Sequence, residues 1–196
     1  MSPIIGARGG LSASAYGLFA PSLATNSYES IATATGSGAN SVTFSSLGTY
    51  KHLQIRGNIR CTGASGTSLL WWRFNSDSTI SNYAMHGLGG DGSTAFGYQI
   101  TNSYGMGLVG STAHSGSLAN AFTGVIVDIL DFGNTNKTKT VRSIRGEDYN
   151  GSGEIRLASG VWLSTSAITS ITIGFLDNGG SQFATNSSIA LYGIKG

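Results

Sequence analysis

The sequence predicts an all-β protein, an antiparallel jelly-roll-like β-sandwich with an extended N-terminal arm. Three observations predict it. Apolar and polar residues alternate with a period of two in several segments, as in strands that bury one face. The linkers between them are rich in Gly, Asn, Asp and Ser, the residues of tight turns. No window carries the apolar stripe and caps of an amphipathic helix, so we expect under about 10% helix.

Residues 1–26 are expected to form a docking arm, separate from a sandwich domain over 27–196. Between Ile4 and Ala20 the chain is mainly Gly, Ala and Ser, and it follows neither a two-residue nor a 3.6-residue period. Small residues let a backbone approach a surface closely, and isolated large ones fill pockets. We expect the arm to dock onto another protein through Ile4, Ile5, Arg8, Leu11, Tyr16, Leu18 and Phe19.

Strand patterns follow in order along the rest of the chain. Segments 51–60, 154–163 and 170–176 each alternate, which predicts one buried and one wet face. The residues of the apolar faces are Leu53, Ile55, Gly57 and Ile59; Ile155, Leu157 and Val161; and Ile171, Ile173 and Phe175. Segments 121–130 and 187–195 are apolar on both faces, as expected of central or doubly covered strands. We expect roughly eight strands of this kind, closed into a sandwich.

Region 75–120 departs from this alternation of apolar and polar residues, because it is rich in Gly, Ser, Thr and Asn with tyrosines spaced through it. Its plain interpretation is a set of loops and edge strands; its functional interpretation is an exposed recognition surface. Aromatic faces stack on sugars, and neighbouring amides bind hydroxyls. The absence of Lys and Arg from 74 to 136 favours a neutral polysaccharide. The candidate contact residues are Tyr83, His86, Tyr98, Asn102 and Tyr104, and the alternative is that these tyrosines bury against neighbouring copies.

Trp71 and Trp72 are adjacent, so in a strand their side chains face opposite ways. One is expected between the sheets. The other is expected on the outer face, where a subunit interface is the commoner use of a large aromatic residue and sugar stacking is the alternative.

Composition favours an assembled protein. Only 10% of the 196 residues are charged and the net charge is +2, which gives a free monomer little repulsion to keep it soluble. We expect a homo-oligomer, with a trimer favoured. The small charge and the absence of a linear basic tract argue against a nucleic-acid partner. No apolar run has the length of a membrane span, so no membrane insertion is expected.

Catalytic and metal-binding patterns were sought without success. Cys61 is the only cysteine, and the spacing of the three histidines matches no ligand motif, so no metal and no cofactor are expected. Asp128 and Asp131 are three residues apart, which places them on opposite faces of a strand. Neither a nucleophile elbow, a zinc-protease helix nor a phosphate loop is recognisable. We expect a protein that is not an enzyme.

Several stretches resemble small virion proteins of tailed bacteriophages, notably marine and cyanobacterial ones. They are IIGARGGLSASAYGLFA, SYESIATATGSG, TYKHLQIRGNIR, WRFNSD and SSIALYGIKG, and the similarity spans nearly the whole chain. The resemblance implies β-sandwich modules attached to tail fibres, baseplates or capsids, often as trimers. It implies no catalytic residues.

The residues and the resemblance together leave three candidate functions. The first is a tail-fibre or tail-tip protein, anchored in the virion by its arm to other virion proteins and concerned with host adsorption, with a host-surface glycan as the candidate ligand. The second is a capsid-decorating protein on the virion exterior. The third is a carbohydrate-binding, lectin-like module.

Overall fold

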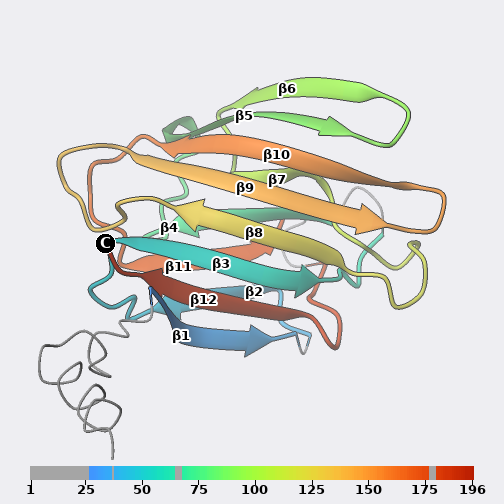
Figure 1. Ribbon diagram of the computed structural model, residues 1–196, viewed down its shortest axis with the longest axis horizontal. Helices are drawn as coiled ribbons and strands as arrows, with labels where there is room; N and C mark the ends of the chain where they lie inside the picture. Colours follow the sequence, from blue (N-terminus) through green and yellow to red (C-terminus); the bar gives the residue numbers. More distant parts are fainter. Residues whose placement is uncertain (1–26, 37, 65–67, 177–179) are drawn as a thin grey trace, which may run out of the picture.

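The computed structural model describes residues 27–36, 38–64, 68–176 and 180–196 of the chain. The seven predicted docking residues of the arm therefore lie outside the described residues. Two antiparallel β-sheets, here called sheet A and sheet B, pack face to face (Figure 1). Among the described residues the only helical element is a 3₁₀ turn, Ile80–Asn82. The all-β prediction is confirmed.

Sheet A has eight strands and sheet B has four. In spatial order, sheet A contains β1 (Tyr28–Thr35), β12 (Ser188–Ile194), β3 (His52–Ile59), β8 (Thr123–Ile129), β9 (Lys139–Asp148), β10 (Gly153–Trp162), β5 (Tyr83–Gly90) and β6 (Ala95–Thr101). Sheet B contains β2 (Ser41–Ser45), β11 (Ser170–Phe175), β4 (Leu69–Phe74) and β7 (Met106–Ser111).

Two hairpins explain why the sheets differ in width. The chain alternates between the sheets from β1 to β4, and β7, β8, β11 and β12 continue that alternation. The hairpins β5–β6 and β9–β10 each stay within sheet A, which they widen toward β6, its outermost strand at that end (Figure 1). Asn150 and Gly151 turn the β9–β10 hairpin with positive φ angles of 60° and 116°, as the Asn-Gly pair predicts.

The core lies between the inner faces of the two sheets. Large aromatic side chains fill it: the Phe74 and Trp162 rings meet edge to face at 5.6 Å, and the Phe175 and Phe183 rings lie 4.7 Å apart. The predicted facing of 51–60 and 170–176 is confirmed, since their apolar side chains are buried: Leu53, Ile55, Ile59, Ile171, Ile173 and Phe175.

The predicted facing of 154–163 is wrong. Ile155 and Leu157 lie on the outer face of sheet A and are half exposed, whereas Ala158 and Trp162 point into the core. The reason is that β10 is apolar on both faces near its end, and the large ring of Trp162 buries more surface than Ile155 or Leu157 can. A pattern of period two gives the alternation but not which face is inside.

Candidate interaction surface on the outer face of sheet A

A row of aliphatic side chains crosses the outer face of sheet A, at right angles to its strands. Strand register sets Leu88 of β5 opposite Leu157 of β10, Leu157 opposite Ile144 of β9, and Ile144 opposite Ile126 of β8. Their exposed fractions are 60%, 48%, 41% and 39% in that order. We call these four residues the apolar row. Figure 1 views this face directly, with sheet B behind it.

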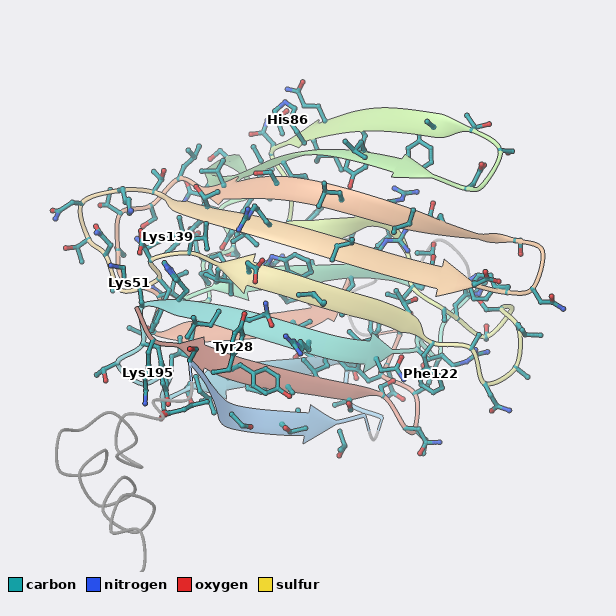
Figure 2. All side chains as sticks on the ribbon, in the orientation of Figure 1. Tyr28, Lys51, His86, Phe122, Lys139 and Lys195 are labelled. Atoms are coloured by element: carbon teal, nitrogen blue, oxygen red, sulfur yellow. The ribbon has the colours of Figure 1, made fainter. Side chains whose placement is uncertain are left out.

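Beside the apolar row runs a polar row, His86, Ser159, Arg142 and Asp128, one residue from each of the same strands. Of its charged residues, Asp128 has a hydrogen-bond partner within the chain. Arg142 lies opposite Asp128 in the register, and Asp128 accepts a hydrogen bond of 2.7 Å from Gln54 Nε2. Figure 2 labels His86 at the β5 end of this row.

The neighbouring strand β3 contributes one further charge to this face, Arg56, which lies opposite Ile126 at the end of the apolar row. Arg56 Nε donates to Gln54 Oε1 at 2.7 Å, and its guanidinium carbon lies 5.7 Å from the ring centres of both Tyr28 and Tyr192. The face therefore combines exposed hydrocarbon with a carboxylate and a guanidinium, those of Asp128 and Arg56, that each bond to Gln54.

On the other side of the apolar row lies a glycine row, Gly90, Ile155, Gly146 and Gly124. Its three glycines have room for a side chain: a Cβ would meet nothing closer than 3.6 Å at Gly90, 3.7 Å at Gly146 and 3.9 Å at Gly124. None of them has a positive φ angle. The fold of the single chain therefore does not require glycine at these positions, although glycine weakens a strand.

Glycines on the inner face of the same sheet differ. A Cβ on Gly89 would lie 2.7 Å from the Phe96 ring and 2.9 Å from the Ile155 carbonyl oxygen, and one on Gly87 would lie 2.2 Å from Tyr98. These glycines admit the β6 aromatics, so packing within the chain explains them.

A shallow groove lies where the apolar and polar rows meet. It has a volume of about 320 Å³ and is lined by His86, Gly87, Leu88, Arg142, Leu157, Ala158 and Ser159. Its walls are hydrocarbon from two strands with a polar rim, which suits a side chain of another protein better than a charged ligand.

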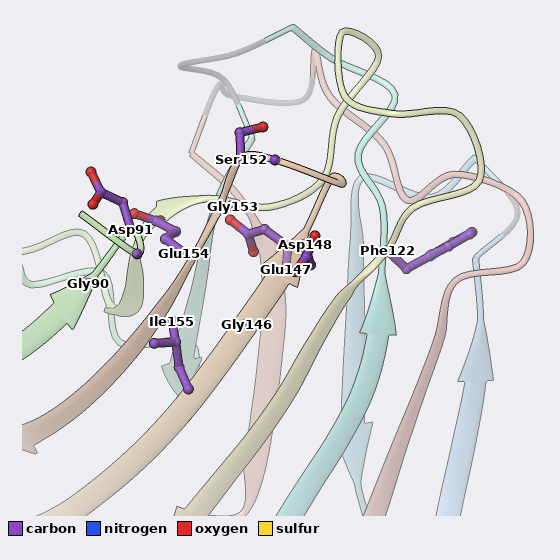
Figure 3. A pocket seen from close by; sticks show the side chains of 12 residues that line it. Gly90, Asp91, Phe122, Gly146, Glu147, Asp148, Ser152, Gly153, Glu154 and Ile155 are labelled. Atoms are coloured by element: carbon purple, nitrogen blue, oxygen red, sulfur yellow. The ribbon is translucent and has the colours of Figure 1, made fainter. Parts of the chain in front are cut away.

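A second hollow, of about 560 Å³, lies at the turns of the β5–β6 and β9–β10 hairpins (Figure 3). Four carboxylates surround it, but the chain itself uses them. Asp91 Oδ1 accepts from the backbone N–H groups of Ser93 and Thr94, which lowers the Asp91 pKa, and Asp148 accepts from the Asn150 N–H. The other two, Glu147 and Glu154, pair with a buried arginine.

That arginine is Arg145, whose side chain is fully buried between the sheets. Its Nη1 donates to both oxygens of Glu147 at 2.6 Å and to the Ser111 carbonyl at 3.1 Å, and its Nη2 pairs with Glu154. Burial lowers the Arg145 pKa, and the hydrogen bonds that Arg145 donates to the Glu147 carboxylate oppose that shift. The cluster holds β9 to β10 and to β7, a structural use of charges that sequence spacing did not reveal.

The five predicted host-contact residues do not form one surface. Tyr83 is buried, its hydroxyl donates to the Asp77 carbonyl at 3.0 Å, and burial raises its pKa to about 12. His86 is exposed on the outer face of sheet A. Tyr98 lies on the opposite face of the same hairpin, over Gly87 and 5.6 Å from the Arg156 guanidinium carbon.

Asn102 and Tyr104 belong to the connection that leaves β6. Asn102 turns the chain with a φ angle of 55°, and Tyr104 is 57% exposed. Of the predicted set, His86 alone lies beside the apolar row, while Tyr83 is unable to reach a ligand without unfolding of the core.

The two tryptophans face opposite ways, as predicted. Trp72 is buried between the sheets, and Trp71 lies half buried on the outer face of sheet B. There the Arg73 guanidinium carbon stacks 4.4 Å from the centre of the Trp71 ring system. Whether Trp71 contacts another subunit stays a prediction.

Asp128 and Asp131 engage different partners, but not by lying on opposite faces of one strand, because β8 ends at Ile129 and Asp131 lies in the turn that follows. Asp128 binds Gln54, whereas Asp131 pairs with Lys137, and its backbone N–H donates to His52. Within the described ranges, no group of three or more His, Cys, Asp and Glu side chains is placed to hold a metal ion. In that same part of the chain, no helix combines the length and hydropathy required to cross a membrane.

Comparison of the chain with protein-family models, with curated proteins and with solved structures gave no match. Sequence reasoning missed the apolar row because it assigned Leu157 to the core. The signal that points to it was present in segment 121–130, which is apolar on both faces although one face of β8 is bare in the single chain.

Proposed function

We propose that this chain is a non-enzymatic structural protein of a tailed-phage virion, a tail-fibre or tail-tip component that assembles through the outer face of sheet A. The observation that carries the proposal is the apolar row, four aliphatic side chains exposed in register on a sheet face. Contiguous exposed hydrocarbon of this kind marks interaction surfaces in soluble proteins.

The strand order supports a jelly-roll module of the kind expected from the sequence. Without the two inserted hairpins, the order is β1-β12-β3-β8 in one sheet and β2-β11-β4-β7 in the other. Two four-stranded sheets joined by connections that cross between them make up a jelly roll, an architecture common in viral capsid and lectin domains. The fold class alone does not fix a function. The virion assignment rests on the resemblance of the sequence stretches quoted above.

Charge supports the same role. Because only 10% of the residues are charged and the net charge is +2, copies of the chain repel one another little. Such a surface suits a permanent assembly, whose interfaces are depleted of charge at their centres.

Quantitative mass spectrometry of purified particles from the phage that encodes the chain tests the proposal. We expect the protein in the particle at a few to a few dozen copies, the stoichiometry of a tail component. Hundreds of copies would replace the tail assignment with capsid decoration. Absence from purified particles, together with glycan binding by the isolated protein, would replace both with the lectin-like function.

A further inference from the structure

We infer that the outer face of sheet A is covered by the same face of a second copy of this chain, related by a two-fold axis that runs along the apolar row. The inference names the partner at the surface proposed above and so rests on the proposed function. It comes from the side-chain sizes in the three rows, which complement one another under that rotation.

A two-fold axis along the apolar row sets each of its residues against the same residue of the other copy. Leu157 then faces Leu157 of the partner subunit, and Ile144 faces Ile144 of the partner subunit. The four exposed aliphatic side chains of each copy leave water together, which is the favourable term for association.

The same rotation sets the polar row of one copy against the glycine row of the other. In β5, β9 and β8 the residue of the polar row in one copy faces a glycine of the other copy. The facing pairs are His86 with Gly90, Arg142 with Gly146, and Asp128 with Gly124. In the fourth pair the sizes are reversed, because Ser159 is small and Ile155 is large. Every pair thus joins a larger side chain to a smaller one, as close packing requires.

The glycine row gains an explanation from this arrangement. Gly90, Gly124 and Gly146 have space for a Cβ within the chain and no positive φ angle, so neither sterics nor backbone conformation requires them. Glycine inside a strand often marks close approach by another chain. Side chains of the polar row of a second copy would occupy that space.

The area of the face agrees with a stable pair. Neighbouring strands are about 4.8 Å apart and rise about 3.3 Å per residue, so the five strands from β3 to β5 present on the order of 600 Å² per copy. Two such faces reach the lower end of standard protein interfaces, at about 1,200 Å² in total. Asp128 accepts a hydrogen bond from Gln54 of its own face. Arg56 lies opposite Ile126 on the line of the axis, but its guanidinium reaches to Gln54 and lies over the Tyr28 and Tyr192 rings.

Cross-linking of full-chain variants that each carry one added cysteine, with a short bismaleimide, tests this geometry. The natural Cys61 is 1% exposed and gives little background. We expect Leu157→Cys and Ile144→Cys each to link to its own kind, because the axis passes through the row. The matched control is Leu163→Cys: Leu163 is 53% exposed, close to the 48% of Leu157, but lies beyond β10 and outside the rows.

A mixture of Arg142→Cys and Gly146→Cys chains is expected to link across the two copies more than either variant alone. Equal linking by Leu163→Cys, or no linking at the apolar row, overturns the two-fold arrangement. Cross-linking found only in a mixture of Leu88→Cys and Arg56→Cys chains would also overturn it. That pairing is the one expected if the two-fold axis ran parallel to the strands.

A glycine variant separates assembly from folding. Gly146→Val, made in the Leu157→Cys chain, is expected to keep the far-ultraviolet circular dichroism and thermal stability of its parent. Cross-linking should fall at least about tenfold, because the valine side chain fills the space that Arg142 of the partner copy would occupy. Undiminished linking overturns the inference. The virion assignment is tested separately, because particle mass spectrometry reports incorporation whichever surface pairs the copies.

Discussion

Asp77 fastens the connection between β4 and β5 through a single carboxylate. Its Oδ2 accepts from Trp162 Nε1 at 2.7 Å and from Asn82 Nδ2 at 2.8 Å, and its Oδ1 accepts from the Thr79 N–H at 2.9 Å. Burial of the carboxylate would raise its pKa, but these hydrogen bonds to the ionised form outweigh burial and lower the pKa to about 2.

The Asp77 pKa predicts a loss of stability in acid. Because the folded pKa of about 2 lies below the unfolded value of 3.8, the carboxylate stabilises the fold above about pH 4. The contribution disappears as the pH falls toward 2. Asp77→Asn should lower the free energy of unfolding at pH 7 by about 1 kcal/mol, a figure reduced for the partial exposure of the group.

Urea titrations of the parent and the Asp77→Asn variant at several pH values measure this effect. The two unfolding free energies should converge between pH 4 and pH 2. A difference that stays constant over that interval would show that the ionised carboxylate does not supply the stability.

Arg145 is the residue whose loss should cost most among the charged side chains. Arg145→Met leaves Glu147 and Glu154 near the core without their shared partner, and breaking a buried ion pair from one side costs about 3–5 kcal/mol. Lys137→Met is the control, because Lys137 is 54% exposed in its pair with Asp131 and such pairs contribute at most about 1 kcal/mol. Equal midpoints in urea for the two variants would contradict a structural role for the buried cluster.

At the scale of the strand, glycines on the two faces of sheet A should respond in opposite ways to the same substitution. Gly89→Ala sets a Cβ 2.7 Å from the Phe96 ring and 2.9 Å from a backbone oxygen, so it should destabilise the fold by about 1–3 kcal/mol. Gly124→Ala meets nothing closer than 3.9 Å and should be neutral or stabilise by up to about 1 kcal/mol.

Thermal and urea unfolding of both glycine variants should be measured in a Leu157→Asp chain, where self-association does not contribute. Destabilisation by Gly124→Ala as large as that by Gly89→Ala would mean that the outer-face glycine is needed by the single chain. The structural basis for an interface at the glycine row would then be gone.

The docking arm gives a prediction at the scale of a segment. The sequence of the arm lacks the two-residue alternation of a sandwich strand, so we expect the core not to depend on it. Deletion of residues 1–22 should leave the circular dichroism and unfolding midpoint nearly unchanged but prevent incorporation into particles. Unfolding of the truncated protein would show that the arm belongs to the core.

How much of this fold the sequence predicts differs from strand to strand. In β3 and β11 a single apolar face meets polar neighbours, so the alternation identifies both the strand and its buried side. In β10 both faces carry large apolar residues, and alternation is unable to choose between Leu157 and Trp162 for the core. The choice depends on which strand of sheet B lies opposite, which is a long-range property.

The candidate surface was harder to predict than the fold for a related reason. The apolar row draws one residue from each of four strands, and only the register between strands reveals that Leu88, Leu157, Ile144 and Ile126 are neighbours. The predicted contact residues lie in one segment of the sequence, 75–120, but strand alternation places Tyr83 and Tyr98 on the inner side and His86 on the outer side.

At the scale of the whole molecule, the protein combines a well-packed interior with one bare apolar sheet face. Low charge, the exposed apolar row and three glycines that the single chain does not require all favour a partner on that face. These features are costly in a monomer, since exposed hydrocarbon promotes aggregation and glycine weakens strands. In an assembly the exposed side chains and the glycines would lie within an interface.

The most direct test of this account is the mass of the full chain in solution, measured by sedimentation equilibrium at micromolar concentrations with a Leu157→Asp variant beside it. The account predicts that the parent sediments at twice the 20.1 kDa of one chain, while Leu157→Asp, which buries a charge in the apolar row, sediments at 20.1 kDa with its fold intact. A trimer that persists in the Leu157→Asp variant would show that the interface lies on another surface, and it would agree with the trimer expected from the sequence. A parent protein that stays at 20.1 kDa throughout would contradict the central claim that copies of this chain cover the outer face of sheet A.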